Sequence, residues 1–214
     1  MKGIRFVAGA ACVVFLLSGM GCKGSQPTAP SRHKHLIIMV DDSESAVTEM
    51  KSTYEEILSK LAFKASGRGI TFTWKWFVNN PRLEIDNVDF KDTDEFNDIV
   101  DKKVKTGLFS KERGTNYGTM LEDSADQCTD HGNDDVYELV LSDGAPDDSA
   151  ADVIKGAEKL SQASNLKRLL ILPVKAQFRD KLIKLLKSLK PTLLTGGEEI
   201  DGQDQLDKFI KELL

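Results

Sequence analysis

The 214-residue sequence has little cysteine, little proline and no excess of positive charge. Three cysteines and six prolines in a chain of this length exclude a disulfide scaffold, a collagen-like repeat and a low-complexity chain. The formal net charge is −5, so no basic stripe is expected to bind nucleic acid. What remains, 40% hydrophobic and 29% charged residues, is enough for one hydrophobic core, and two full domains would be crowded.

The only segment apolar enough to meet a membrane lies at the N-terminus. Lys2 and Arg5 precede residues 6–20, which are apolar or small and carry no charge. This run is shorter than the roughly 20 residues that a membrane-spanning helix needs. Its length and its positive start are typical of a secretory signal peptide. Residues 1–21 are therefore predicted to be a signal peptide.

Small residues at positions 18–21 lead directly into Cys22. This junction resembles the lipobox of bacterial lipoproteins, with Gly19 at a position where that family prefers leucine. The resemblance implies that Cys22 is lipidated and that the protein is anchored in the cell envelope on the extracytoplasmic side. Lys23 stands where an aspartate would favour inner-membrane retention, which favours the outer membrane. An ordinary cleaved signal peptide and an uncleaved anchor remain the alternatives.

Residues 22–34 are polar and include two prolines, which predicts a flexible tether ahead of a domain at 35–214. His33 and His35 stand at the end of this tether and could bind a metal ion, but two ligands beside a strand are weak evidence for such a site. His131 lies in a polar loop and is expected to be exposed to solvent.

Cys128 shares helical spacing with Tyr117, Leu121 and Ala125, so it is predicted to be a buried apolar residue and not a nucleophile. Nucleophilic catalysis would need a serine or cysteine beside a positioned histidine. No such pairing is evident, and the protein is predicted not to be an enzyme.

Buried strands alternate along the chain with amphipathic helices. Apolar runs or alternation predict strands at residues 36–40, 70–78, 83–90, 136–141, 168–174 and 192–194. Helical spacing of apolar residues predicts helices near residues 47–61, 92–100, 117–128, 149–160, 178–189 and 206–213. Residues 105–114 are predicted to form a polar loop. This alternation favours a doubly wound α/β fold with a mostly parallel sheet and helices on both faces, in which residues 83–90 return as an antiparallel edge strand.

Oxygen-bearing side chains follow the first predicted strand. Asp41, Ser43 and Ser45 lie in the turn where that strand leads into a helix. Carboxylate and hydroxyl oxygens suit a hard divalent cation, although serines at this place could also do no more than cap the helix. Because doubly wound sheets bind ligands at the carboxyl ends of their strands, this turn is a candidate site.

Two later turns are expected at the same edge of the sheet. Thr115 follows Gly114 at the start of a helix, and Asp143 follows the strand at 136–141. Three turns that carry oxygen ligands at one edge are hard to attribute to chance. The sequence therefore predicts a cation site formed by Asp41, Ser43, Ser45, Thr115 and Asp143.

The order and spacing of these five residues closely resemble the metal-ion-dependent adhesion site of the von Willebrand factor type A (vWA) domain, over residues 35–214. The resemblance implies that Ser43 and Ser45 bind the metal directly, that Thr115 binds directly or through water, and that Asp41 and Asp143 act mainly through bound water. The ion would be magnesium, with manganese or calcium as alternatives. An open coordination position would take a carboxylate from a partner protein, in adhesion or in assembly of an envelope complex.

Two other interpretations compete with this one. Residues 36–43 and 139–147 also resemble the phosphoacceptor sites of a response-regulator receiver domain. The separation of about a hundred residues between Asp41 and Asp143 is roughly twice what a receiver needs. A vWA-like domain whose metal serves only its own structure is the second alternative.

Overall fold

The computed structural model describes residues 32–89, 91–102, 114–197 and 200–214. The predicted signal peptide, Cys22 and the tether up to residue 31 lie outside these residues, as does the predicted polar loop apart from Gly114. Within the described part of the chain, no helix has the length and apolar character needed to cross a membrane.

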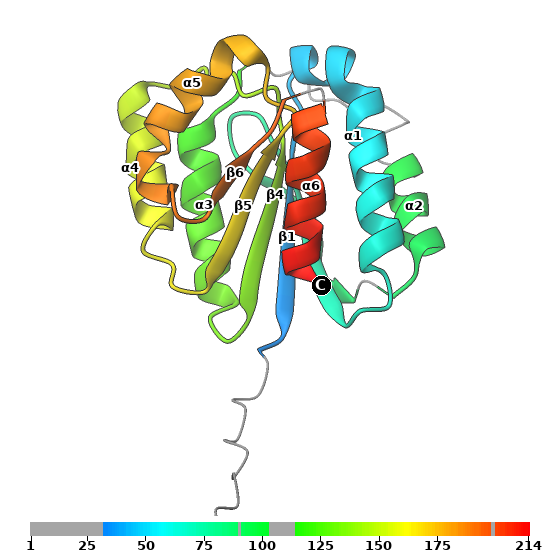
Figure 1. Cartoon of the computed structure of the whole chain (residues 1–214). Helices are drawn as coiled ribbons and strands as arrows, with labels where there is room; N and C mark the ends of the chain where they lie inside the picture. Colours follow the sequence, from blue (N-terminus) through cyan, green and yellow to red (C-terminus); the bar gives the residue numbers. More distant parts are fainter. Residues whose placement is uncertain (1–31, 90, 103–113, 198–199) are drawn as a thin grey trace, which may run out of the picture. The chain divides into compact units, whose positions relative to one another are not determined.

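The described residues of the compact unit Arg32–Leu214 form six strands and six α-helices, which mostly alternate along the chain (Figure 1). The strands are β1 (Lys34–Asp41), β2 (Ile70–Phe77), β3 (Arg82–Asp89), β4 (Asp135–Leu141), β5 (Leu166–Leu172) and β6 (Leu193–Thr195). The α-helices are α1 (Glu44–Ala65), α2 (Thr93–Val100), α3 (Tyr117–Asp130), α4 (Ala150–Leu160), α5 (Ala176–Leu185) and α6 (Ile200–Leu213), and a short 3-10 helix, η2 (Lys187–Leu189), follows α5.

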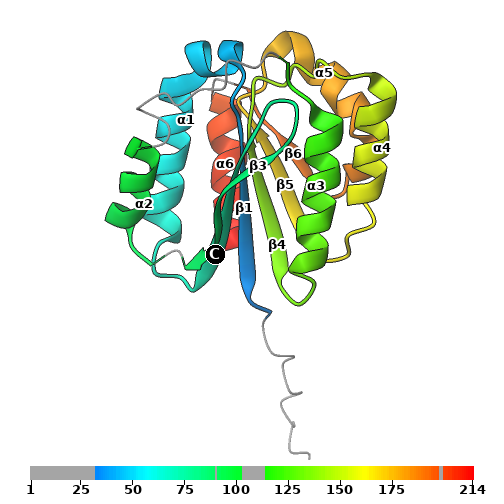
Figure 2. The ribbon, with the colours of Figure 1, turned by 180° about the vertical axis from the view of Figure 1, so that it is seen from behind.

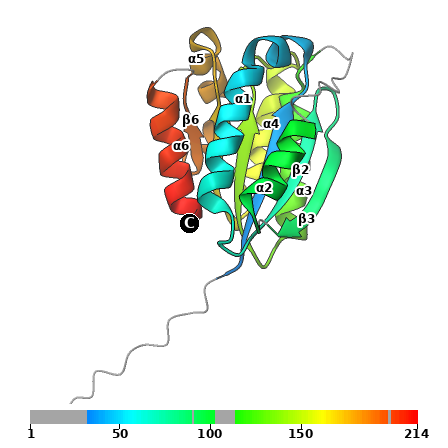
Figure 3. The ribbon, with the colours of Figure 1, turned by 90° about the vertical axis from the view of Figure 1, so that its right-hand side faces the viewer.

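The strands form one sheet in the order β3-β2-β1-β4-β5-β6. All neighbouring pairs are parallel except β2 and β3, which are antiparallel. Figure 3 shows β3 beside β2 at its edge of the sheet. The doubly wound, mostly parallel fold with an antiparallel edge strand is therefore confirmed.

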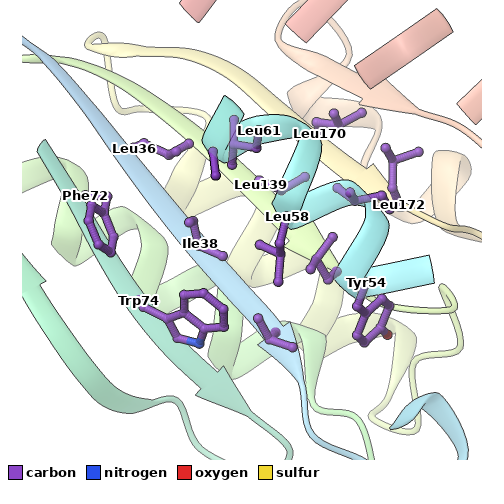
Figure 4. Packing of buried hydrophobic residues seen from close by; sticks show 14 of the residues in the cluster. Leu36, Ile38, Tyr54, Leu58, Leu61, Phe72, Trp74, Leu139, Leu170 and Leu172 are labelled. Atoms are coloured by element: carbon purple, nitrogen blue, oxygen red, sulfur yellow. The ribbon is translucent and has the colours of Figure 1, made fainter. Parts of the chain in front are cut away.

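Helices cover both faces of the sheet, and each face has its own hydrophobic core. Helices α1, α2 and α6 enclose one cluster, and α3, α4 and α5 enclose the other. Figure 1 shows α1 and α6 in front of the sheet, and the opposite view in Figure 2 shows α3 there. In the first cluster, Leu58 and Leu61 of α1 lie over the strand residues Ile38 and Leu139 (Figure 4). Burial of these side chains supplies most of the free energy that holds the sheet between its helices.

Residues 70–78 alternate between apolar and polar side chains. From the sequence alone this pattern predicts a strand with one covered and one solvated face, and the prediction of a solvated face is wrong. Thr73 and Lys75, on the face opposite the tryptophans, are both buried. The Lys75 ammonium bonds to both carboxylate oxygens of Asp123 on α3, at 2.9 and 2.7 Å. The Thr73 hydroxyl donates to Asp86 on β3 at 3.3 Å. Tertiary partners for the polar atoms thus allow a polar strand face to be buried.

Cys128 lies on the buried face of α3, within the core, as predicted for a small apolar residue. Burial raises the pKa of its thiol, and the nearby Glu138 carboxylate adds to this effect. A thiol that resists ionisation is a poor nucleophile.

Candidate metal centre

The carboxyl ends of β1 and β4 lie side by side, because the register pairs Val40 with Leu141. Asp41 ends β1, and Ser142 and Asp143 directly follow β4. These ends lie at the upper edge of the sheet in Figure 1. The parallel pairing thus brings together two turns that are about a hundred residues apart in sequence.

Three separate segments donate hydrogen bonds to the carboxylate of Asp41. The Ser43 backbone N–H donates to Oδ1 at 3.0 Å, and the Ser142 hydroxyl donates to Oδ2 at 2.8 Å. The Thr115 hydroxyl lies 3.4 and 3.3 Å from the two oxygens. Asp41 itself is fully buried. The carboxylate is therefore the point on which the turn after β1, the approach to α3 and the turn after β4 converge.

Burial raises the pKa of Asp41 to about 6, against the opposing effect of the Ser43 and Ser142 hydrogen bonds. The negative charge of Asp143 adds to the increase. None of the ion pairs found in the described part of the chain involves Asp41. A buried carboxylate without a paired lysine or arginine is costly in the ionised form, and a bound divalent cation would offset that cost.

Ser43 and Ser45 lie at the start of α1, where Ser43 is the N-cap residue. Its hydroxyl accepts a hydrogen bond from the Ala46 N–H at 3.4 Å, and the two serine hydroxyl oxygens are 3.5 Å apart. The hydroxyl of Ser43 therefore caps the helix and also lies beside the Ser45 hydroxyl, which places two neutral oxygen ligands next to Asp41.

The position of Thr115 is fixed by a residue that the sequence did not indicate. The Thr115 N–H donates to Asp147 Oδ2 at 3.0 Å, and the Asp147 N–H donates back to the Thr115 carbonyl at 3.0 Å. Gly114, with φ of +108°, gives the chain the left-handed turn that leads into Thr115. Asp147 is exposed to solvent, yet its backbone N–H and its carboxylate hold a predicted ligand in place.

Asp143 is buried at the turn after β4, where its Oδ1 accepts the Ala145 N–H at 3.0 Å. Its Oδ2 lies 3.2 Å from the Lys175 ammonium, which is held by Glu49 Oε2 at 2.6 Å. The turn requires glycine at 144, because φ is +85° and a Cβ there would lie 2.6 Å from Val174 Cγ1.

A surface hollow of about 420 Å³ opens beside these side chains. Its lining residues come from the start of α1, from Gly114 and from the loop after β4: Ser43, Glu44, Ser45, Thr48, Glu49, Gly114 and Asp147. Solvent and a partner can therefore reach the two serine hydroxyls, whereas Asp41 and Asp143 lie deeper.

The donor set suits a hard divalent cation. It consists of oxygens only: three hydroxyls and two buried carboxylates. Among the described residues, no three His, Cys, Asp or Glu side chains gather closely enough to hold a metal ion. A cation at this edge would thus depend on Ser43, Ser45 and Thr115. The structure brings the five predicted residues to one place, and adds Ser142, Asp147 and Lys175, which the sequence did not identify.

No family model matches the chain, and no curated protein matches it. Solved structures do. BatB from Bacteroides thetaiotaomicron is 12% identical with a TM-score of 0.63, over 84% of this chain and 98% of that one. The manganese-loaded TRAP protein of Plasmodium vivax is 16% identical with a TM-score of 0.62, over 84% and 74%.

A von Willebrand factor type A protein from Catenulispora acidiphila is also similar, with 16% identity and a TM-score of 0.58, over 86% of this chain and 42% of that one. At such low identity the likeness concerns the backbone alone, and it agrees with the strand order and the antiparallel edge described above. The chain therefore has the von Willebrand factor type A fold.

Proposed function

We propose that the chain is a protein-binding module whose binding depends on a divalent cation held by Asp41, Ser43, Ser45, Thr115 and Asp143. The observation that carries this proposal is the buried Asp41 carboxylate, on which donors from three segments converge. Among the described residues it has no lysine or arginine partner. The manganese in the TRAP protein, which has the same fold, adds support. Magnesium is the ion we expect, with manganese or calcium as alternatives.

The charge of the donor set indicates the chemistry of the partner. Three of the five donors are neutral hydroxyls, so a divalent ion that contacts the hydroxyls directly and the two carboxylates through water keeps part of its positive charge. Such an ion supplies a Lewis-acidic position that an outside carboxylate can complete. The hollow above Ser43 and Ser45 leaves room for an acidic side chain to approach. The partner is therefore a protein that presents an aspartate or glutamate.

Binding is the proposed activity, without catalysis. Of the residues described, those that line the hollow include neither histidine nor cysteine, so they offer no nucleophile with a positioned imidazole. The signal peptide predicted at residues 1–21 and the predicted lipidation of Cys22 support a lipid-anchored protein of the bacterial cell envelope, which would act in adhesion or in the assembly of an envelope complex. Lys23 favours the outer membrane as the site of anchoring.

Capture of partners from an envelope extract tests the proposal directly. The wild-type protein should retain a partner in magnesium, release it in EDTA and regain it when magnesium returns. The variant Asp143→Ala should fold normally and capture nothing. Asp126→Ala is the matched control, since it removes an exposed carboxylate of α3 remote from the site. Capture that is unchanged by EDTA would contradict the proposal.

Calorimetry separates this function from a purely structural metal. Ser43→Ala combined with Ser45→Ala should weaken magnesium binding in the isolated protein. If magnesium binds to the wild-type protein but partner capture ignores it, the metal serves the structure alone.

The anchor needs its own test. The variant Cys22→Ala should lose the lipid and keep its signal peptide, which mass measurement of the purified protein detects. If the purified Cys22→Ala protein instead has the mass of a chain without its signal peptide, an ordinary signal peptidase processes it.

A further inference from the structure

One lysine reaches into the candidate metal centre. Lys175 is the residue before α5, and its backbone N–H donates to the Asp143 carbonyl at 2.9 Å. Its ammonium nitrogen lies 3.2 Å from Asp143 Oδ2 and 2.6 Å from Glu49 Oε2 on α1. The Lys175 side chain is 22% exposed and that of Asp143 is 6% exposed. The backbone N–H and the side-chain ammonium of Lys175 thus both contact Asp143.

This arrangement differs from an ordinary surface ion pair. Exposed pairs contribute little, because water screens both charges. Here one partner is the buried carboxylate of Asp143, and Asp143 is itself one of the residues that would hold the cation. A cation in contact with a buried carboxylate interacts strongly with it, because little water lies between them to screen the charges.

The other ion pairs at this edge of the sheet also distinguish Lys175. Asp42, the neighbour of Asp41, pairs with Arg82 at 3.4 Å. Asp41 forms no ion pair with a lysine or arginine among the residues described, and Asp143 pairs with Lys175. Among the ion pairs of the described residues, Lys175 is therefore the lysine that contacts one of the two carboxylates that the metal would need.

We propose that Lys175 is an internal competitor of the divalent ion: its ammonium neutralises Asp143 when the site is empty and must withdraw when the site fills. This inference rests on the proposed function. Its consequence is a weakened affinity for the metal, so that Lys175 sets the cation concentration at which the site becomes occupied. The side chain can withdraw without a change of backbone, since a lysine stem has four rotatable methylene groups.

Glu49 completes the device. Its carboxylate lines the hollow beside Ser43 and Ser45 and lies 2.6 Å from the Lys175 ammonium. The lysine that leaves Asp143 therefore keeps a partner at the rim and stays within reach of the site. The competition is reversible for this reason, and loss of the cation returns the ammonium to Asp143.

The matched pair Lys175→Met and Lys184→Met tests the proposal. Both remove one positive charge from the same helix region, but Lys184 is exposed on α5 and has no part in the site. We expect calorimetry to give a magnesium Kd about tenfold tighter for Lys175→Met than for wild type, and unchanged for Lys184→Met. Lys175→Arg keeps the charge and should bind magnesium as weakly as wild type.

A second measurement needs no metal. In EDTA, Lys175→Met should melt several degrees below Lys184→Met, since Asp143 loses the charge that balances it. Magnesium at saturation should remove this difference. If Lys175→Met fails to fold, Lys175→Gln compared with Lys175→Arg gives the same contrast.

The outcomes separate the two proposals. Equal magnesium affinities in wild type and Lys175→Met would overturn the competition and leave the metal centre standing. If neither wild type nor any variant binds magnesium, manganese or calcium in calorimetry, the metal centre is overturned, and the competition with it. Tighter binding in Lys184→Met as well would reduce the effect to net charge and overturn the specific role of Lys175.

Discussion

The two ends of β1 and β4 carry opposite solutions to the same problem, which is how to bury polar side chains at the edge of a sheet. At the carboxyl ends, Asp41 and Asp143 are buried carboxylates surrounded by hydroxyl groups. At the amino ends, His35 on β1 lies against His131, which follows α3, and Asp134 lies just before β4. One end gathers negative charge, and the other gathers imidazoles.

The two imidazoles at the amino end stack on each other, and each Nδ1 lies within hydrogen-bond distance of a neighbouring side chain. The rings of His35 and His131 stack with centroids 3.5 Å apart and planes 12° apart. His35 Nδ1 lies 2.8 Å from the Thr71 hydroxyl, and His131 Nδ1 lies 3.1 Å from Asp134 Oδ2. The prediction that His131 is exposed is wrong, because its ring lies under His35 and its side chain is only 12% exposed.

The comparison teaches that a cluster of ligand-type residues forms a cation site only under two conditions. Its donor atoms must point at one shared position, and the negative charge there must lack a positive partner. Two stacked rings direct their nitrogens along parallel planes, so they do not converge on one ion. Burial lowers the pKa of His35 to about 3, and the nearby His131 adds to the decrease. The His35 imidazole thus stays neutral at neutral pH, whereas the two carboxylates at the carboxyl end need a positive charge from a bound ion or from Lys175.

Removal of the Asp41 carboxylate should have the largest effect on the difference between the two ends. In Asp41→Ala, the stabilisation by magnesium that we expect in wild type should vanish entirely, because the donors of three segments lose their common acceptor. Thermal melting in magnesium against EDTA measures this difference. His131→Ala at the other end should keep the full magnesium response even if it melts lower. A magnesium response that survives in Asp41→Ala would contradict the site.

Glu138 sharpens the contrast from the middle of β4. It is buried with only the Ser124 hydroxyl donating to it, and burial raises its pKa to about 8. Between pH 4.5 and 8 the folded state holds a proton that the unfolded state has lost, so the stability from this group falls as the pH rises. Glu138→Gln should raise the free energy of unfolding by about 3 kcal/mol at pH 7 and leave it unchanged near pH 4.

Urea unfolding at the two pH values checks this expectation. An equal gain at both would mean that packing, and not the proton, is responsible. Unlike Asp41→Ala, Glu138→Gln should leave the metal response unchanged, since Glu138 is buried within β4 and is none of the five predicted ligands.

The low pKa of His35 predicts a pH dependence of stability that is opposite in sign to that of Glu138. Because the pKa of His35 is about 3 when folded and near 6.5 when unfolded, the unfolded chain binds the extra proton as the pH falls below 6.5. Stability should therefore fall on acidification. Wild type should lose about 2 kcal/mol more than His35→Asn between pH 7 and pH 5. Parallel pH profiles for the two proteins would show that His35 does not titrate differently on folding.

The smallest effect belongs to the third histidine. His33 is 44% exposed and its Nδ1 lies 3.6 Å from Asp134 Oδ1. His33→Ala should change the free energy of unfolding by less than about 0.5 kcal/mol, as expected for a screened pair. Urea unfolding at pH 7 measures it, and a larger loss would place His33 among the groups that hold the amino end together.

The sequence predicts the positions of the candidate ligands because strand ends and turns are local features. Asp41, Ser43 and Ser45 follow an apolar run, and Asp143 follows another, so the parallel sheet alone brings them to one edge.

The supporting residues could not be predicted, because each depends on a contact between distant segments. Ser142 was visible as part of a turn, but nothing local shows that its hydroxyl bonds to Asp41, 101 residues earlier. Lys175 reaches Glu49 across 126 residues, and Asp147 meets Thr115 across 32. The burial of Lys75 likewise depends on Asp123, which α3 brings over β2 only once the domain has folded.

The paired hydrogen bonds between Thr115 and Asp147 have a mechanical consequence. They clasp the approach to α3 to the loop that leads into α4, and the Thr115 hydroxyl links that clasp to the end of β1. A partner that pulls on a ligand at this edge would load three elements at once. Tension would spread into the centre of the sheet, and a single loop would not have to bear it.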